Sequence, residues 1–157
     1  MSTQPRPDLK NPVHLLAFGF GAGLVPRAPG TAGSLVGAVL YLPLSALPLA
    51  AYLVLLGVLF AGGVWLCGRT AGDLGVHDHG GIVFDEIVGI LVAVTALPLD
   101  WRWLLIAFLL FRLFDIIKPW PIRLLDRRVK GGLGIMLDDL VAGIAALALL
   151  QSGLHLL

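Results

Sequence analysis

Long runs of apolar residues constrain this chain more than any other feature of its sequence. The 157 residues are 58% hydrophobic and 13% charged, with a mean hydropathy of +0.93. The charged share is about half of that in soluble globular proteins, so a soluble fold would lack polar surface. We therefore expect an all-α fold, a polytopic membrane helix bundle with about five spans plus a short N-terminal helix. The five expected spans are Gly33–Leu47, Leu49–Gly68, Ile82–Pro98, Trp101–Lys118 and Gly134–Leu156.

The start of the chain differs in composition from the rest. Residues 1–12 are polar and contain prolines, and we expect a flexible N-terminal tail there, followed by a single membrane-embedded domain over 13–157. The tail has no apolar core preceded by basic residues, so we do not expect it to be a cleaved signal peptide. Pro12–Phe20 is apolar but shorter than the roughly 20 residues that a spanning helix needs. It is therefore the expected short N-terminal helix.

The basic residues are distributed unevenly along this topology. With five spans, the segments 1–32, 69–81 and 119–133 lie on one side of the membrane. Every lysine and arginine except Arg102 falls in these segments or at the adjoining helix ends. Since such residues collect on the cytoplasmic side, we place that side in the cytoplasm. The net charge is only +1, and no basic repeat with interleaved aromatics occurs, so no nucleic-acid partner is expected.

Acidic residues collect at that same side, within or beside the apolar segments. A charged residue inside a spanning helix costs about 2.5–3.5 kcal/mol, so such a cluster indicates a functional site. Mutual repulsion requires that some carboxylates are protonated or that a cation neutralises them. Oxygen ligands without a Cys/His set favour a hard ion such as Mg²⁺. The alternative for Asp138 and Asp139 is a favourable charge at a helix N-terminus. The acidic candidates are Asp85, Glu86, Asp115, Asp138 and Asp139.

Basic side chains accompany the cluster. Arg112 and Lys118 flank Asp115 at i±3 spacing, so the three share one helix face. They can bind a phosphate, or they can form a structural ion pair with the carboxylate. The following segment carries basic residues that suit either phosphate or anionic-lipid contacts. These residues are Arg123, Arg127, Arg128 and Lys130.

Two further segments offer candidate side chains. His77 and His79 can bind a metal, shuttle protons or donate hydrogen bonds to phosphate, or they can be solvated loop residues. The glycine-rich segment Gly19–Ser34 precedes an expected helix, whose free amides favour anions, and Thr31 and Ser34 add hydroxyls. The alternative there is a helix cap within a close-packed turn. The segment lacks the pattern of a nucleotide P-loop.

These motifs closely resemble those of the phosphatidylglycerophosphatase A family. The family comprises bacterial inner-membrane, Mg²⁺-dependent enzymes that remove the terminal phosphate from phosphatidylglycerophosphate to give phosphatidylglycerol. The resemblance implies this substrate, a phospholipid in the bilayer, and a multi-pass location in the bacterial inner membrane. The matching stretches are Pro29–Thr31, Gly33–Ser34, His77–Gly89, Phe111–Ile122, Gly131–Asp139 and Ala142–Gly143.

The resulting hypothesis is a Mg²⁺-dependent lipid phosphatase with its active site at the cytoplasmic membrane interface. Asp115 is either a further ligand or the base, and His77 or His79 protonates the leaving group. Hydrolysis proceeds either by direct attack of water or through a covalent aspartyl-phosphate. The alternative is a cation or proton transporter with an acidic relay, which needs carboxylates distributed through the membrane depth. The expected Mg²⁺ ligands are Asp85, Glu86, Asp138 and Asp139. The expected phosphate contacts are Arg27, Thr31, Ser34, Arg112, Lys118 and Arg123.

Overall fold

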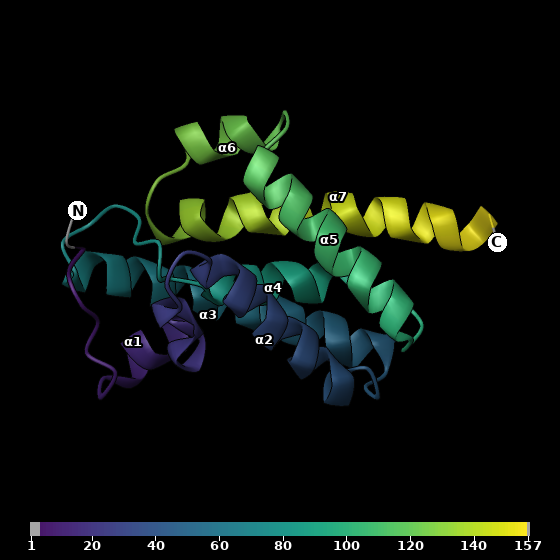
Figure 1. Ribbon diagram of the computed structural model, residues 1–157, viewed down its shortest axis with the longest axis horizontal. Helices are drawn as coiled ribbons and strands as arrows, with labels where there is room; N and C mark the ends of the chain where they lie inside the picture. The colour runs from purple at the N-terminus through teal and green to yellow at the C-terminus, as the bar shows by residue number, and fades with distance from the viewer. Residues whose placement is uncertain (1–3, 157) are drawn as a thin grey trace.

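The computed structural model describes residues 4–156, and this part of the chain is helical without any strand (Figure 1). The all-α prediction is confirmed. The helices are α1 (Pro12–Ala17), the 3-10 helix η1 (Gly19–Leu24), α2 (Pro29–Leu44), α3 (Leu49–Asp73), α4 (Phe84–Ala93), α5 (Trp101–Ile117), α6 (Ile122–Arg128) and α7 (Gly131–Leu156).

Local sequence explains most of the helix boundaries. Asn11 caps α1 by accepting a hydrogen bond from the Val13 amide, and Asp100 caps α5 by accepting one from the Arg102 amide. Helix α5 ends at Ile117, and the next residue, Lys118, adopts a left-handed conformation (φ 47°) before a proline. These boundaries lie within a few residues of those predicted from the apolar segments.

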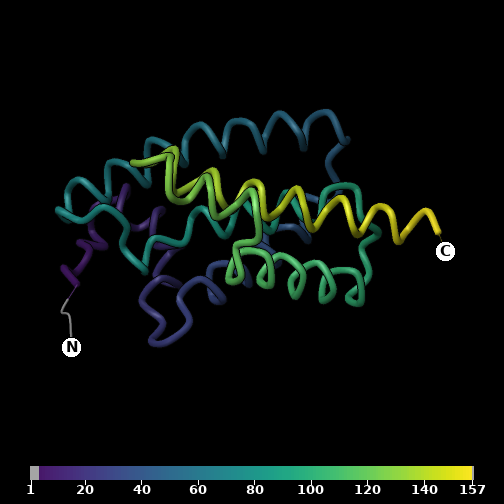
Figure 2. The backbone as a smooth tube through the Cα atoms, turned by 90° about the horizontal axis from the view of Figure 1, so that it is seen from above, coloured from purple at the N-terminus to yellow at the C-terminus, as the bar shows by residue number. Residues whose placement is uncertain are grey.

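The helices alternate in direction, which brings several of their ends together. The N-terminal ends of α2, α4 and α7 and the C-terminal ends of α3 and α5 lie at one end of the bundle, which we call the acidic end (Figure 1). Helix α6 and the N-terminal segment lie there too. Figure 2 shows α7 running from this end to the opposite one, between α3 and α5. The acidic residues of three helices therefore meet at one end, as predicted.

Helix α4 forms the centre of the bundle and contacts α2, α3, α5 and α7. Glycines allow these close approaches. A Cβ at Gly143 of α7 would lie 2.5 Å from the Gly89 carbonyl oxygen of α4. A Cβ at Gly89 would lie 2.5 Å from the Phe111 ring of α5. Such small-residue contacts are typical of helix packing in membranes. The core of the protein thus supports the first turn of α4, where Asp85 and Glu86 lie.

Two of the described helices, α3 and α7, are long and apolar enough to cross a membrane by length and composition. The predicted number of about five spans is not confirmed. Helix α4 contains ten residues, which corresponds to about 15 Å, or half the thickness of a hydrocarbon core. The outer helices nevertheless expose many large apolar side chains to their surroundings, among them Val54, Val58, Trp65, Leu109 and Ile116.

Candidate active site

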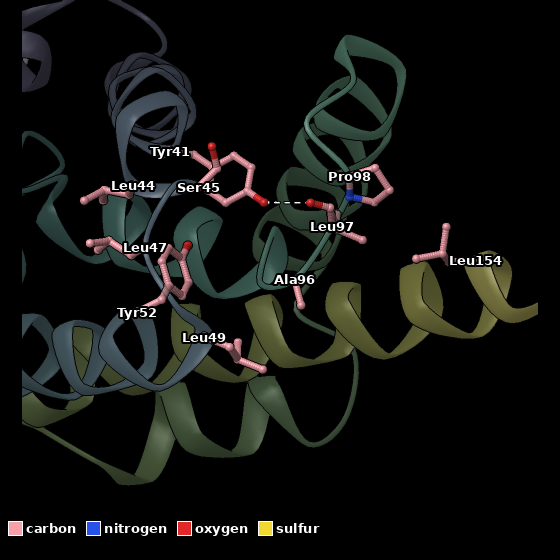
Figure 3. A pocket seen from close by; sticks show the side chains of 10 residues that line it. All are labelled: Tyr41, Leu44, Ser45, Leu47, Leu49, Tyr52, Ala96, Leu97, Pro98 and Leu154. Carbon is pink, nitrogen blue, oxygen red and sulfur yellow. Dashed lines mark hydrogen bonds between the residues drawn. The ribbon is translucent and has the colours of Figure 1, made fainter.

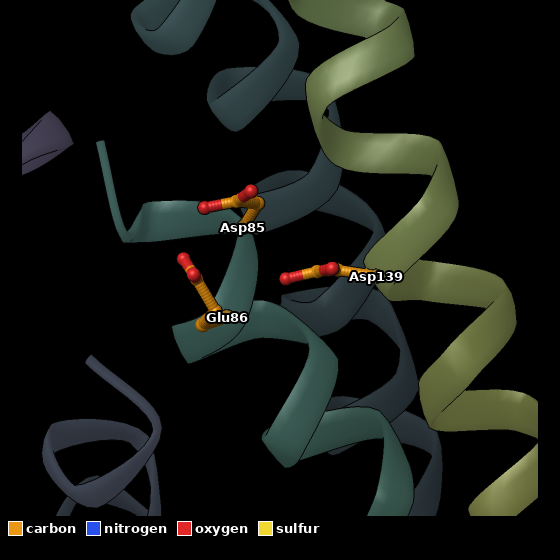
Figure 4. A group of neighbouring side chains, drawn as sticks. All are labelled: Asp85, Glu86 and Asp139. Carbon is orange, nitrogen blue, oxygen red and sulfur yellow. The ribbon is translucent and has the colours of Figure 1, made fainter. Parts of the chain in front are cut away.

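Three carboxylates come together at the acidic end. Asp85 and Glu86 lie in the first turn of α4, and Asp139 approaches them from α7 (Figure 4). One oxygen atom from each carboxylate lies within 4.8 Å of the other two. Each of the three side chains also has one buried oxygen without a hydrogen-bond partner among the described residues. We call this group the carboxylate triad.

The triad needs a cation or protons to be stable. Two unit charges 4.8 Å apart repel by about 3–4 kcal/mol at an effective dielectric constant of about 20. The N-terminus of α4 stabilises the charges of Asp85 and Glu86, but such an effect typically contributes only about 0.3–1 kcal/mol each. For Asp139 the helix terminus contributes little, because α7 begins two turns earlier, at Gly131. Stabilisation by helix N-termini therefore does not offset the repulsion among the three carboxylates.

Two other acidic residues of the predicted cluster have cationic partners. Asp115 pairs with Arg112, three residues earlier on α5. The Asp138 carboxylate accepts a hydrogen bond from Lys118 Nζ at 2.6 Å. The structure thus brings the predicted acidic residues together but divides them into an unpaired triad and two ion pairs.

Lys118 also contacts a carboxylate that the sequence analysis did not select. Asp126 of α6 accepts a hydrogen bond from Lys118 Nζ at 2.8 Å. Burial lowers the pKa of Lys118, but its bonds to Asp126 and Asp138 outweigh this effect and raise the pKa above its ordinary value. The ammonium group therefore stays charged. No helical periodicity could have linked Lys118 to Asp126, because a turn separates α5 from α6.

A polar pocket of about 230 Å³ opens above these residues. The three triad residues line it together with Lys118 and its partners Asp126 and Asp138. Negatively charged carboxylates and a positively charged ammonium group therefore share the pocket. The pocket is large enough for a phosphate group and a cation, not for a whole lipid. Its titratable lining residues are His77, Asp78, His79, Asp85, Glu86, Asp115, Lys118, Asp126, Lys130, Asp138 and Asp139.

The two histidines of the loop before α4 have different surroundings. His79 is buried, its Nδ1 accepts a hydrogen bond from the Gly81 amide, and its Nε2 lies 2.9 Å from the Pro5 carbonyl oxygen. Because that carbonyl can only accept, Nε2 carries the proton, and both ring nitrogens are used. His77 is exposed and lines the pocket. His77 is thus better placed than His79 to exchange protons with a ligand.

The N-terminal segment contributes to this arrangement. Residues 1–3 of the predicted tail lie outside the described part of the chain. Beyond them, Pro5 contacts His79, and the Asp8 amide donates a hydrogen bond to Nδ1 of His14 at 3.1 Å. His14 is itself buried and lies 3.4 Å from an Asp73 carboxylate oxygen. Residues 5–14 therefore run along the acidic end and contact the histidine loop.

The predicted phosphate contacts are spread over several places. Gly30 brings the start of α2 against Glu86 and Arg112, because a Cβ there would lie 2.4 Å from Glu86 Oε1 and 3.0 Å from Arg112 Nη1. Ser34 is buried and its hydroxyl donates to the Gly30 carbonyl at 2.8 Å, so it supports the helix internally. Lys118 lines the pocket. Thr31 is partly buried in the first turn of α2.

Of the six predicted phosphate contacts, only Lys118 is among the residues that line the acidic pocket. Thr31, Ser34 and Arg112 are not among them, and Arg27 and Arg123 lie on other parts of the surface. Arg27 is exposed and adopts a left-handed conformation with a φ of 73° before α2. Arg123 lines a separate groove on α6. Neither is among the residues that line the acidic pocket.

A larger cavity, of about 350 Å³, lies at the opposite end of the bundle (Figure 3). Its walls are mainly apolar. The Tyr41 hydroxyl donates to the Leu97 carbonyl at 2.8 Å, and the Tyr52 hydroxyl donates to the Leu91 carbonyl at 2.7 Å. The two hydroxyls therefore connect α2 and α3 to α4 and to the turn that follows it. Among the described residues, the cluster of acidic side chains with Lys118 and the two loop histidines lines the smaller pocket at the acidic end.

Comparisons with known proteins agree with the earlier resemblance. The family model described as Phosphatidylglycerophosphatase A matches residues 15–153. A phosphatidylglycerophosphatase A of Haemophilus influenzae is 51% identical over 141 residues, which cover 88% of this chain and 86% of the relative. That of Escherichia coli is 49% identical over 148 residues, covering 92% and 85%. No solved structure matches this chain.

Proposed function

Because the chain belongs to the phosphatidylglycerophosphatase A family, we propose that it hydrolyses phosphatidylglycerophosphate to phosphatidylglycerol and inorganic phosphate. Its relatives are phosphatases that act on a phosphate monoester. The observation that carries the proposal is the carboxylate triad, whose three residues line a pocket of phosphate size and each keep one buried oxygen without a partner among the described residues.

The donor set of the triad fits a hard divalent cation. Asp85, Glu86 and Asp139 offer carboxylate oxygens only, and their mutual distances are short enough to share an ion. These residues would hold Mg²⁺, with Asp138 beside them through its unpartnered Oδ1. A bound Mg²⁺ would act as a Lewis acid toward the phosphate and lower the pKa of water.

The basic residues compensate for the charge of the substrate. A phosphate monoester carries about −1.5 to −2 charge at pH 7, and the triad alone would repel it. Lys118 lies in the pocket, and Arg112 lies beside Glu86 behind it. Lys118 can exchange one carboxylate partner for a phosphate oxygen without losing its charge. Arg112 holds Asp115 in place and adds positive charge at the rear of the site.

Proton transfers complete the hydrolysis. Water supplies the oxygen that bonds to phosphorus as the bond from phosphorus to the glycerol oxygen breaks. Asp115 lines the pocket and can take the proton of this water. His77, also on the pocket wall, can give a proton to the departing glycerol oxygen. His79 holds the loop through its bonds to Pro5 and Gly81.

We place the protein in the bacterial inner membrane as a multi-pass chain with the acidic end toward the cytoplasm. The apolar helices α3 and α7, the exposed apolar side chains and the basic residues at the acidic end support this placement. In the proposed topology α2, α4 and α5 complete the five passes, with the short α4 enclosed by its neighbours. The acyl chains of the substrate remain in the bilayer while its headgroup enters the pocket.

The transporter alternative lacks support from the distribution of carboxylates. A relay requires acidic groups along the depth of the membrane. Within residues 4–156, the triad and its neighbours lie at the acidic end, whereas Asp100 at the opposite end caps α5. A single local cluster suits chemistry at an interface better than transport through the bundle.

Phosphate release tests the proposal directly. Purified protein is supplied with phosphatidylglycerophosphate or with phosphatidic acid, each with Mg²⁺ or with EDTA. We expect phosphate release from phosphatidylglycerophosphate with Mg²⁺ and little with EDTA. Folded Asp139→Asn protein is expected to lose about 10²-fold or more in kcat. Near-normal turnover by Asp139→Asn would remove the triad from the catalytic machinery, and turnover in EDTA would contradict the role of Mg²⁺.

A further inference from the structure

Helix α6 has two different faces. Its inner face packs against the bundle, where Ile122 is buried and the Asp126 carboxylate bonds to Lys118. Successive side chains turn by about 100° along a helix, so the intervening residues project outward. They line a separate groove of about 410 Å³, formed by Pro119, Trp120, Arg123, Leu124 and Arg127.

The groove carries positive charge without an acidic partner. Arg123 and Arg127 are one turn apart and exposed, and neither forms an ion pair with another described residue. Asp126, the acidic residue of α6, is directed to the inner face by its bond to Lys118. Two guanidinium groups one turn apart suit the oxygens of a phosphate group.

Large apolar side chains are also exposed in this groove and on α5, the helix that precedes it in the chain. Trp120 is 81% exposed, an unusual position for an indole unless an apolar partner covers it. Exposed apolar side chains along α5 lead toward it, about one helical turn apart. A ligand of this surface therefore combines an apolar chain with an anionic group. The stripe consists of Leu105, Leu109, Leu113, Ile116 and Ile117.

We propose that this groove is a binding site for the phosphodiester group of an anionic phospholipid. Arg123 and Arg127 contact the phosphate oxygens, Trp120 lies at the level of the glycerol, and the acyl chains follow the α5 stripe. The site is separate from the acidic pocket, since the two share no lining residue. The inference rests on the membrane placement proposed above, but it does not depend on phosphatase activity.

The test measures retained lipid by native mass spectrometry. Full-length protein in detergent is titrated with dioleoyl phosphatidylglycerol and, separately, with zwitterionic dioleoyl phosphatidylcholine. The test variant is Arg123→Gln/Arg127→Gln. Its matched control, Arg6→Gln/Lys10→Gln, removes two charges from the N-terminal segment at the same end of the molecule. Asp139→Asn reports on lipid held in the acidic pocket.

We expect the native protein to bind phosphatidylglycerol more tightly than phosphatidylcholine, and the test variant to bind phosphatidylglycerol about tenfold or more weakly. The control and Asp139→Asn should bind as the native protein does. Unchanged binding by the test variant overturns the site, as does an equal loss in the control or a loss in Asp139→Asn. Phosphate release is measured separately, so its absence would refute the phosphatase proposal and leave the lipid site standing.

Discussion

At Gly30 the first turn of α2 leaves no room for a side chain beside the carboxylate triad. A Cβ there would lie 2.4 Å from Glu86 Oε1, whereas ordinary contacts begin at 3.4 Å. The Glu86 carboxylate would have to move by about 1 Å. A misplacement of about 1 Å at a catalytic group can cost about 10²-fold in rate. We therefore predict that Gly30→Ala lowers kcat/KM for phosphatidylglycerophosphate by about 10²-fold.

The same substitution should have little effect on stability. Alanine is preferred over glycine within helices by up to about 1 kcal/mol. The group displaced is the far end of a flexible side chain, so the usual overpacking penalty of about 1–3 kcal/mol is reduced. We expect a thermal unfolding midpoint close to that of the native protein.

A matched glycine on α3 provides the control. A Cβ at Gly62 would meet no atom within 4 Å, so Gly62→Ala should retain both activity and the unfolding midpoint. Phosphate release and circular dichroism melting in the same detergent measure the two properties. If Gly30→Ala keeps kcat/KM within threefold of the native value, Glu86 does not need the position that the structure gives it.

Four further substitutions test the pocket, the histidine loop and the opposite end of the bundle. Lys118→Met should raise the KM by about tenfold or more, since a hydrogen bond to a charged group contributes about 1.5–3 kcal/mol; an unchanged KM in steady-state assays would exclude a phosphate contact. His77→Gln should lower kcat by about 10²-fold, whereas His79→Gln should mainly lower the unfolding free energy, by about 1–3 kcal/mol for two lost hydrogen bonds. A large loss of kcat in His79→Gln together with a loss of stability in His77→Gln would instead make His79 the proton donor and His77 the structural residue. Tyr52→Phe should lower the unfolding free energy by about 1 kcal/mol and leave kcat/KM unchanged; a tenfold loss of activity would link the opposite end of the bundle to catalysis.

Local sequence patterns predict the helices well. The apolar segments gave α5 and α7 to within a few residues, because prolines, glycines and capping side chains mark their ends. The segment Ile82–Pro98 was less well predicted, since α4 ends at Ala93 and a turn with a left-handed Ala96 follows. Continuous apolar sequence does not reveal such a turn, in which Val94, Thr95 and Leu97 are buried and Ala96 is exposed.

The grouping of acidic residues at one end was also predictable, because helix alternation fixes which ends meet. Their division into a triad and two ion pairs was not. Lys118 bonds to Asp126 on α6, beyond a turn, and to Asp138 on the neighbouring helix α7. Sequence spacing does not predict such contacts between different helices. Likewise, His77 and His79 look equivalent in sequence, but only the fold brings the Pro5 carbonyl oxygen to the second ring nitrogen of His79.

The response of thermal unfolding to Mg²⁺ tests the carboxylate triad most directly. A cation bound only to the folded protein stabilises it by about 2.7 kcal/mol at a hundred times its Kd, so the native unfolding midpoint should rise with Mg²⁺. Removing one charge relieves the repulsion among the three carboxylates. Asp139→Asn should therefore melt above the native protein in EDTA and gain little from Mg²⁺. A variant that melts lower in EDTA and still responds fully to Mg²⁺ would contradict a shared cation at Asp85, Glu86 and Asp139.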